Sequence, residues 1–157
     1  MTFSAKTEYG VRLMVRLGRQ PGGQPTSLKA IAEAEGLPLP YLEHVVADLK
    51  RAGLVTSTRG AHGGYRLERP AADIAMDAVV LALEGSVAPM DCFENLPSER
   101  VSCSHEGDAG QACSTRLLWL RVQGGVIKAL QGTTLAELVE FSDRHEPQRH
   151  THEAVPA

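Results

Sequence analysis

Apolar residues recur at helical spacing in three segments of the first third of the chain. They predict helices over residues 5–19, from 26–27 to 36, and over 41–52, with Thr26 or Ser27 as the cap of the second helix. A Pro-Gly-Gly run ends the first helix, and single glycines end the other two. The side chains expected to face the core are Tyr9, Leu13, Met14, Leu17, Leu28, Ile31, Ala32, Leu42, Val45, Val46 and Leu49.

The apolar pattern then changes from helical spacing to alternation. Residues 54–58 and 65–67 are predicted strands, and the glycine-rich segment between them predicts a hairpin. Two short helices joined by a tight turn and followed by a hairpin make a winged helix-turn-helix. Many such helix pairs have no DNA role, and the hairpin with Arg59 at its base favours DNA binding. The second helix is expected to expose Tyr41, Glu43, His44, Asp48 and Arg51.

Further helices follow on either side of a polar segment. They are predicted over residues 75–83, 114–130 and 134–141. The long middle helix is apolar around most of its circumference, which favours burial against a second copy of the chain; a central core helix is the alternative. The predicted fold class is therefore mainly α with a small β-hairpin wing, a winged helix-turn-helix plus a long dimerisation helix. The expected organisation is a DNA-binding domain over 1–70, a connecting helix over 71–90, a cysteine loop over 91–113, dimerisation and closing helices over 114–142, and a flexible tail over 143–157.

Charge is distributed unevenly along the 157 residues. Residues 1–70 hold ten Lys and Arg against six Asp and Glu, whereas residues 71–157 hold six against thirteen. The first half therefore carries +4 and suits a phosphate backbone, although the whole chain carries −3. No apolar run approaches the roughly 18 residues of a membrane span, and the N-terminus lacks the pattern of a secretion signal. We expect a cytoplasmic, nucleoid-associated protein with no membrane partner.

All three cysteines, Cys92, Cys103 and Cys113, lie in one polar segment with the spacing Cys-x10-Cys-x9-Cys. A buried structural cysteine belongs on a periodic apolar element, whereas thiols on a loop can converge on one point. Iron binds thiolates well, so this arrangement favours an iron–sulfur cluster. The alternatives are zinc completed by His105, a thiol–disulfide switch, and inert thiols.

The sequence disfavours an enzyme. It has no phosphate-binding loop, no Ser-His-Asp spacing and no paired-carboxylate motif. Cys103 and His105 could imitate a nucleophile and its base, but they lie in a loop with no visible pocket. We expect no small-molecule substrate. An iron–sulfur carrier is a further alternative, although a carrier would not need a basic wing.

Several motifs resemble those of the IscR/NsrR family of bacterial winged-helix regulators. They are Lys6-Thr7-Glu8-Tyr9, Tyr41-Leu42-Glu43, Leu49-Lys50-Arg51-Ala52-Gly53-Leu54-Val55, Arg59-Gly60, Gly63-Gly64-Tyr65-Arg66-Leu67 and Thr134-Leu135-Ala136-Glu137-Leu138-Val139. The resemblance implies a homodimer that binds a palindromic double-stranded DNA operator, with recognition helices in successive major grooves and Arg59 in a minor groove. The candidate DNA contacts are Thr26, Ser27, Lys29, Pro40, Tyr41, Glu43, His44, Arg51, Arg59 and His62.

The resemblance also bears on the cysteines. Family members that carry an iron–sulfur cluster hold it with three cysteines of this loop and one other ligand. In one branch that ligand is a His three residues after the last cysteine, but Arg116 stands there in this chain, and a guanidinium cannot ligate. In another branch it is a carboxylate from the partner subunit, and Glu8 stands at the matching place; His105 and Glu106 are alternatives. The implied protein carries one [2Fe-2S] or [4Fe-4S] cluster per subunit and is a repressor that senses iron, redox or nitrosative state.

Overall fold

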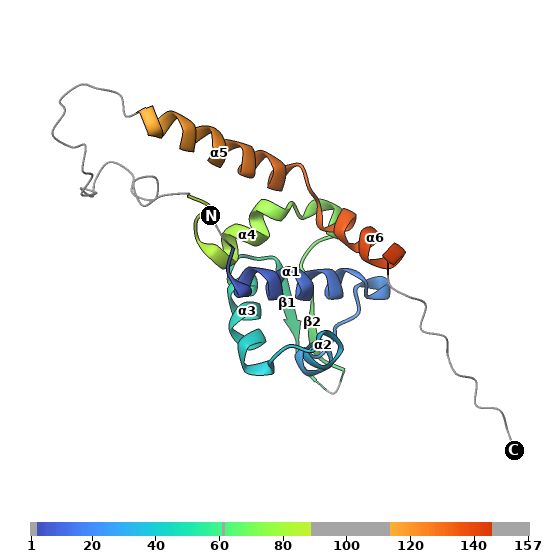
Figure 1. Cartoon of the computed structure of the whole chain (residues 1–157). Coiled ribbons are helices and arrows are strands. Elements are labelled where there is room, and N and C mark those ends of the chain that lie inside the picture. Colours follow the sequence, from blue (N-terminus) through green and yellow to red (C-terminus); the bar gives the residue numbers. More distant parts are fainter. Residues whose placement is uncertain (1–2, 61, 89–113, 146–157) are drawn as a thin grey trace, which may run out of the picture.

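The computed structural model describes residues 3–60, 62–88 and 114–145 of the chain (Figure 1). Within these residues the chain forms α-helices, short 3-10 turns and one antiparallel hairpin, so the predicted mainly α class with a β-hairpin wing is confirmed. The elements are α1 (Ala5–Gly18), η1 (Pro21–Gly23), α2 (Leu28–Glu35), α3 (Leu39–Arg51), β1 (Val55–Thr58), β2 (Gly64–Leu67), η2 (Ala71–Asp73), α4 (Met76–Glu84), α5 (Ser114–Gln131) and α6 (Leu135–His145).

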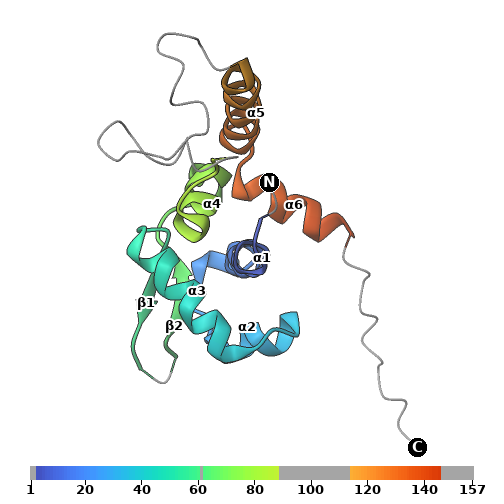
Figure 2. The ribbon, with the colours of Figure 1, turned by 60° about the vertical axis from the view of Figure 1, so that its left-hand side comes forward.

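Helix α1 lies at the centre of the molecule (Figures 1 and 2) and contacts α2, α3, α4, α6 and β2. Its inward side chains Leu13, Met14 and Leu17 are buried as predicted, whereas Tyr9 is half-buried at the edge of the core. One apolar cluster joins these elements, so α2 and α3 are held firmly on the rest of the chain. Its other buried members are Leu28, Ile31, Ala32, Leu37, Leu42, Val45, Val46, Leu49, Leu54, Val55, Ile74, Met76, Val79, Leu83 and Leu135.

Helices α2 and α3 form the predicted helix-turn-helix. Ser27 caps α2, because its hydroxyl accepts a hydrogen bond of 3.2 Å from the Ala30 N–H, and Gly36 ends the helix in the left-handed conformation at φ 65°. Helix α3 begins at Leu39, earlier than predicted. The reason is that Pro40 occupies the first helical turn, where a backbone N–H has no helical partner to lose.

The wing is fastened to the start of α2. β1 and β2 pair antiparallel along their whole length, and Thr26 exchanges two backbone hydrogen bonds of 2.9 and 2.8 Å with Tyr65 of β2. Thr26 therefore pairs with the wing, and Ser27 alone caps α2. Glycine at position 64 permits this close approach, since a Cβ there would lie 2.4 Å from the carbonyl carbon and oxygen of Thr26.

The variant Gly64→Ala is expected to destabilise this part of the fold. The added methyl group meets the backbone of Thr26 rather than a movable side chain, so the wing and α2 must separate. Overpacking of this kind lowers the free energy of unfolding by about 1–3 kcal/mol, which urea denaturation measures. The control is Glu140→Ala, at an exposed position of α6, where alanine favours the helix. Wild-type stability of Gly64→Ala would contradict the close approach.

Helix α6 closes the fold onto α1 and η2. The Met76 N–H donates to the Thr133 carbonyl and the Leu135 N–H donates to the Ile74 carbonyl, each at 2.9 Å. These bonds place the beginning of α6 beside the beginning of α4, and α6 then packs along α1. The helix extends to His145, beyond its predicted end and into the segment expected to be a tail, because its last two side chains hydrogen-bond to carbonyls one turn earlier.

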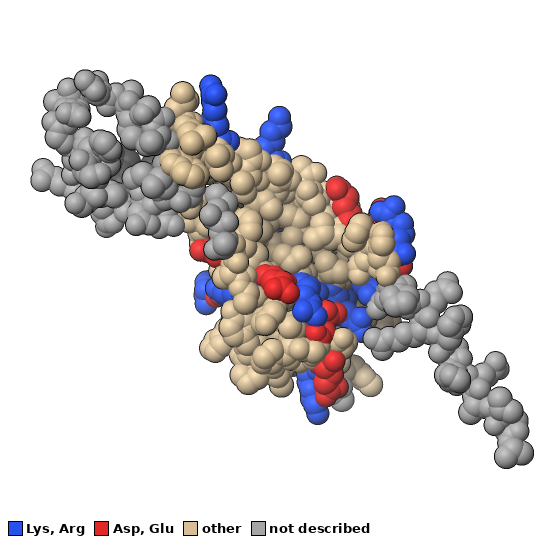
Figure 3. Space-filling model, viewed as in Figure 1, with Lys and Arg blue, Asp and Glu red and all other residues tan. Residues whose placement is uncertain are grey.

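Helix α5 contacts α4 and projects from the rest of the molecule (Figures 1 and 2). None of its described side chains is buried, so it is not a central core helix of this chain. Charged side chains are few over α5 and gather lower down, around α1, α2 and α3 (Figure 3). No helix within the described ranges is long and apolar enough to cross a membrane. The exposed apolar side chains of α5 are Leu117 (57%), Leu118 (56%), Leu120 (47%) and Val122 (37%).

Candidate functional site

The outer face of α3 is exposed and lies beside the wing and α2 (Figure 2). Tyr41 is 37% exposed, and its ring packs edge-on against Tyr9 of α1, with centroids 5.4 Å apart and planes at 79°. The first turn of α3 is therefore anchored on α1 while its polar side chains face solvent. The other predicted contact residues of this helix are exposed: Pro40, Glu43, His44 and Arg51.

The charged side chains near the end of α3 have specific partners. Asp48 pairs with Arg51 at 2.7 Å and with Lys6 of α1 at 2.5 Å. These contacts, the Lys6 hydrogen bond first, hold the pKa of Asp48 below its ordinary value despite the opposing effect of burial. The prediction that Asp48 is exposed is wrong, because its side chain turns toward α1 and is only 19% exposed. Lys50 donates a 2.7 Å hydrogen bond to Ser57 and so ties α3 to β1.

The start of α2 presents a second group of predicted contacts. Ser27 and Lys29 are exposed, whereas Thr26 is half-buried by its pairing with the wing. The Ser27 hydroxyl accepts the capping bond and keeps its own proton to donate. Lys29 lies 3.9 Å from Glu33, and both side chains are well exposed. Such a loose pair leaves the ammonium group accessible to a phosphate.

The turn of the wing carries Arg59 and His62, which are both exposed. Arg59 has no ion pair with any residue in the part of the chain that the structure describes. An unpaired guanidinium on a projecting turn has the charge and the reach that a narrow minor groove attracts.

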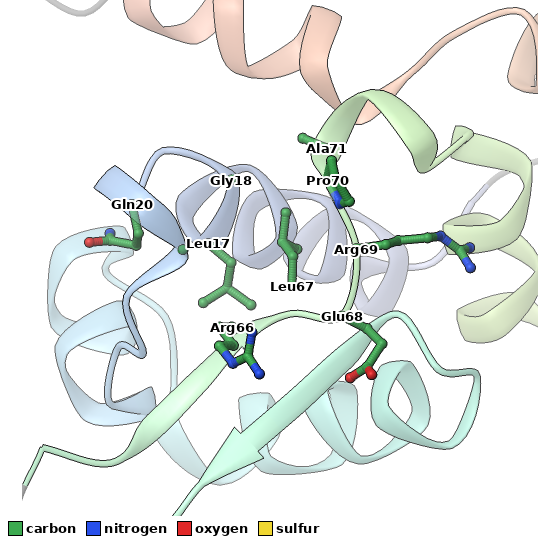
Figure 4. Close-up of a pocket in the computed structure, with 10 residues that line it drawn as sticks. Leu17, Gly18, Gln20, Arg66, Leu67, Glu68, Arg69, Pro70 and Ala71 are labelled. Atoms are coloured by element: carbon green, nitrogen blue, oxygen red, sulfur yellow. The ribbon is translucent and has the colours of Figure 1, made fainter.

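A cavity of about 350 Å³ lies between the end of α1, η2 and the base of the wing (Figure 4). Leu17 of α1 and Leu67 of β2 lie near its centre, while the charged ends of Arg66, Glu68 and Arg69 point away from them (Figure 4). Its apolar lining is small and lies where β2 of the wing packs on α1. Among the described residues no group of three or more His, Cys, Asp or Glu is placed to hold a metal ion.

Glu8, the predicted fourth cluster ligand, lies in the first turn of α1 with its side chain 66% exposed. Its cationic neighbour is Arg12 at 3.8 Å. Arg12 has a closer partner in Glu35, at 3.2 Å, so the Glu8 carboxylate is held only loosely. The other predicted ligands lie outside the described residues: Cys92, Cys103, Cys113 and the alternatives His105 and Glu106.

A network at the start of α1 was not predicted. Glu84, the last residue of α4, accepts hydrogen bonds from the Ser4 N–H at 2.7 Å, the Ser4 hydroxyl at 2.8 Å and the Thr7 hydroxyl at 2.5 Å. Lys6, between those two residues, reaches Asp48 of α3. Ser4 and Glu84 stand 80 positions apart in the chain. No local sequence pattern marks a contact of that kind.

Comparison with known proteins identifies the family. A model of the Rrf2 family, described as an iron-dependent transcriptional regulator, matches residues 3–141. The protein rrf2 of Nitratidesulfovibrio vulgaris is 36% identical over 139 residues, which cover 88% of this chain and 87% of that protein. The HTH-type transcriptional regulator CymR of Bacillus subtilis is 35% identical over 143 residues, covering 91% and 93% of the two chains.

Solved structures agree with the sequence relatives. CymR, called the global cysteine regulator of B. subtilis, matches with a TM-score of 0.72 at 34% identity and covers 90% of this chain and 98% of that chain. IscR of T. potens matches with a TM-score of 0.72 at 33% identity and covers 94% and 92%. CymR and the family as a whole are described as transcriptional regulators and not as enzymes, and the predicted resemblance to IscR-type regulators is confirmed. With a family match over residues 3–141 and the same winged fold in its solved relatives, the chain belongs to the Rrf2 family of transcriptional regulators.

Proposed function

We propose that this regulator is a homodimer that binds a palindromic double-stranded DNA operator, and that an iron–sulfur cluster, one per subunit, sets its affinity for that operator. The observation that carries the proposal is the exposed polar face of α3 beside a wing on which Arg59 has no ion pair with any described residue. A recognition helix needs such a face to reach base edges. The core behind α3 holds that face in place.

In the proposed complex α3 enters a major groove and the wing follows the adjacent backbone. Arg59 reaches into a minor groove, with His62 beside it on the wing. Glu43 can accept a hydrogen bond from a cytosine amino group, and it repels phosphate where the register is wrong. Phosphate contacts come from the start of α2 and the end of α3. The proposed contact residues are Thr26, Ser27, Lys29, Pro40, Tyr41, Glu43, His44, Arg51, Arg59 and His62.

The second subunit packs on α5. The exposed leucines Leu117, Leu118 and Leu120 would be costly to leave in water, and the same helix in a second copy offers a matching apolar surface. A two-fold dimer presents two copies of α3, which suits two half-sites of a palindrome.

The residues present fit an iron–sulfur cluster. Cys92, Cys103 and Cys113 supply thiolates, which iron binds well, and the exposed Glu8 of the partner subunit supplies a weaker, exchangeable carboxylate. Such a donor set is compatible with [2Fe-2S] or [4Fe-4S]. When bound, the group supplies a centre that responds to iron supply, oxidants and nitric oxide. Glu8 then links the two subunits and lies next to Tyr9, which contacts Tyr41 of α3.

The proposed coupling is energetically modest. A difference of about 1–3 kcal/mol between two states of the regulator changes operator affinity roughly five- to 150-fold. A regulator bound across a promoter blocks transcription, so we propose that the protein acts as a repressor on the DNA of the cytoplasmic nucleoid.

A second candidate is a regulator of the same fold that uses the thiols directly or holds zinc with His105. It is supported by the likeness to CymR, which is called a global cysteine regulator, and by a thiol and histidine set that zinc accepts.

Anaerobic purification tests the cluster. The full chain should be coloured, with a visible absorption spectrum and with iron and acid-labile sulfide in each subunit. A colourless, iron-free protein that contains zinc would support the second candidate. An iron-free and zinc-free protein whose DNA affinity changes with thiol oxidation would support a thiol switch.

The variant Arg59→Ala tests the wing. Loss of a minor-groove cation should weaken binding to a selected operator about tenfold and reduce the slope of log affinity against log salt by about one. Fluorescence anisotropy over a salt series measures both. The matched control is Arg144→Ala, which removes an exposed arginine from the end of α6. An unchanged affinity and slope for Arg59→Ala would mean that the wing does not dock as proposed.

A further inference from the structure

We propose that Glu84 and Lys6 are positioning residues, which hold the start of α1 between the end of α4 and the recognition helix α3 and thereby set how well α3 fits its operator. This inference rests on the proposed DNA-binding function. It gives a part in operator affinity to two residues that are not among the proposed DNA contacts.

The first half of the link joins α4 to α1. Ser4, the N-cap of α1, makes no side-chain capping bond of its own. The cap comes instead from the Glu84 carboxylate, a single oxygen of which accepts from the Ser4 N–H, the Ser4 hydroxyl and the Thr7 hydroxyl. A negative charge at this place also interacts favourably with the dipole of α1.

Charge supports this cap. Burial raises the pKa of Glu84, but the hydrogen bonds from Thr7 and Ser4 and the charge of Lys6 together bring that pKa below its ordinary value. The carboxylate therefore stays ionised at neutral pH.

The two helices also pack closely next to this cap. A Cβ at Gly10 would lie 2.2 Å from the Cδ1 of Leu83, so α1 and α4 approach each other where α1 has no side chain. Thr7 is the buried polar residue of this contact, 5% exposed. The end of α4 is thus held by hydrogen bonds and by packing along the first turns of α1. The chain continues from Glu84 to Cys92, the first cysteine, within eight positions.

The second half of the link joins the same turns of α1 to α3. Lys6 pairs with Asp48 at 2.5 Å, and the two side chains are 31% and 19% exposed. Tyr9 contacts Tyr41 at the opposite end of α3. The first turns of α1 therefore hold the recognition helix at both ends. A shift at the end of α4 would pass through Ser4 and Thr7 to α3 without involving α2 or the wing.

The test uses the full chain, purified anaerobically, and a duplex that the wild-type protein selects from a randomised pool. Glu84→Gln and Lys6→Met should each weaken binding about tenfold, within the five- to 150-fold range of such couplings. The slope of log affinity against log salt should stay unchanged, because neither residue is a proposed phosphate contact. Controls with the same changes of charge are Glu140→Gln and Arg144→Met, at exposed positions of α6; both should bind like the wild type.

Asp48→Asn breaks the same ion pair from the side of α3, so it tests the link even if the Lys6 variant misfolds. It removes an acid near the DNA and would strengthen binding if only net charge mattered. A positioning role predicts weaker binding instead, with faster amide hydrogen exchange in α3. Glu84→Gln and Lys6→Met interrupt the same link between α4 and α3. The double variant should therefore lose less affinity than the product of the two single losses.

The outcomes separate the two proposals. Wild-type affinity of Glu84→Gln and Lys6→Met, stronger binding by Asp48→Asn, or a salt slope lowered by about one in Lys6→Met would overturn the positioning role and leave DNA binding intact. Failure of the wild-type chain to select any duplex would reject the proposed function and this inference with it.

Discussion

Replacing Leu117 and Leu120 together with glutamate is expected to convert the proposed dimer into monomers. The two side chains are three positions apart on one face of α5 and are 57% and 47% exposed in the single chain. In the proposed dimer, burial of this face would contribute roughly 25 cal/mol per Å² of apolar surface. Two buried carboxylates would each need a polar or charged partner, and the leucines of a second copy cannot supply one. Sedimentation equilibrium measures the change in mass.

Operator binding should fall with the dimer. A dimer holds two half-sites at once, and loss of one recognition helix lowers affinity by roughly 100- to 10,000-fold. The control is Ala129→Glu with Gln131→Glu, two exposed positions near the end of the same helix, which should leave a dimer. A wild-type protein that sediments as a monomer would refute dimerisation through α5, and so would a Leu117→Glu/Leu120→Glu protein that remains a dimer and binds DNA with wild-type affinity.

The second large effect is expected at the cysteines. Changing Cys92, Cys103 or Cys113 to alanine removes one of the three proposed thiolate ligands, so each variant should lose its visible absorption and nearly all of its iron. Iron and sulfide analysis of anaerobically purified protein measures this loss. Operator affinity should then equal that of the cluster-free wild type. Full iron content in any of the three variants would remove that cysteine from the ligand set.

The variant Glu8→Ala should behave differently from the cysteine variants. A carboxylate is the weaker ligand, so the cluster should still assemble, with a shifted absorption spectrum and faster loss in air. The matched control is Glu33→Ala, which removes another exposed acid paired with a cation one helical turn away. An unchanged spectrum and lifetime in Glu8→Ala would exclude Glu8, and the same measurements on His105→Ala would then test His105.

Local patterns predicted most of the helices and strands. Apolar spacing marked α1, α2 and the buried face of α3, and alternation marked the two strands of the wing. The main differences occur at helix ends. Helix α3 starts earlier because Pro40 fits a first turn, and α6 ends later because its last side chains bond to its own carbonyls. Helix ends depend on single capping contacts, which leave a weaker trace in a sequence than a repeated apolar face.

The candidate site likewise contains residues that local patterns predict and contacts that they do not. The exposed residues of α3 and the wing follow from the buried face of each element, so Glu43, His44 and Arg59 could be identified in advance. The pairing of Asp48 could not, since its position on α3 favours exposure and only the place of α1 brings Lys6 within reach. The Glu84 cap is a further case, because α4 must first pack on α1 before a carboxylate at its end can meet Ser4.

Sequence patterns alone were enough to predict the elements and the fold class, and they contain the uneven charge and the grouping of three thiols in one segment. These properties arise from residue type and short-range spacing, which dictate local conformation and the face each element buries. Three further features depend on how the elements pack together. Among the described residues the apolar face of α5 is exposed, Gly64 lies against the backbone of Thr26, and Glu84 and Lys6 join α4 to α3 through α1. Local patterns do not show these features, because they depend on the relative placement of elements up to 80 positions apart, and packing of the whole core sets that placement.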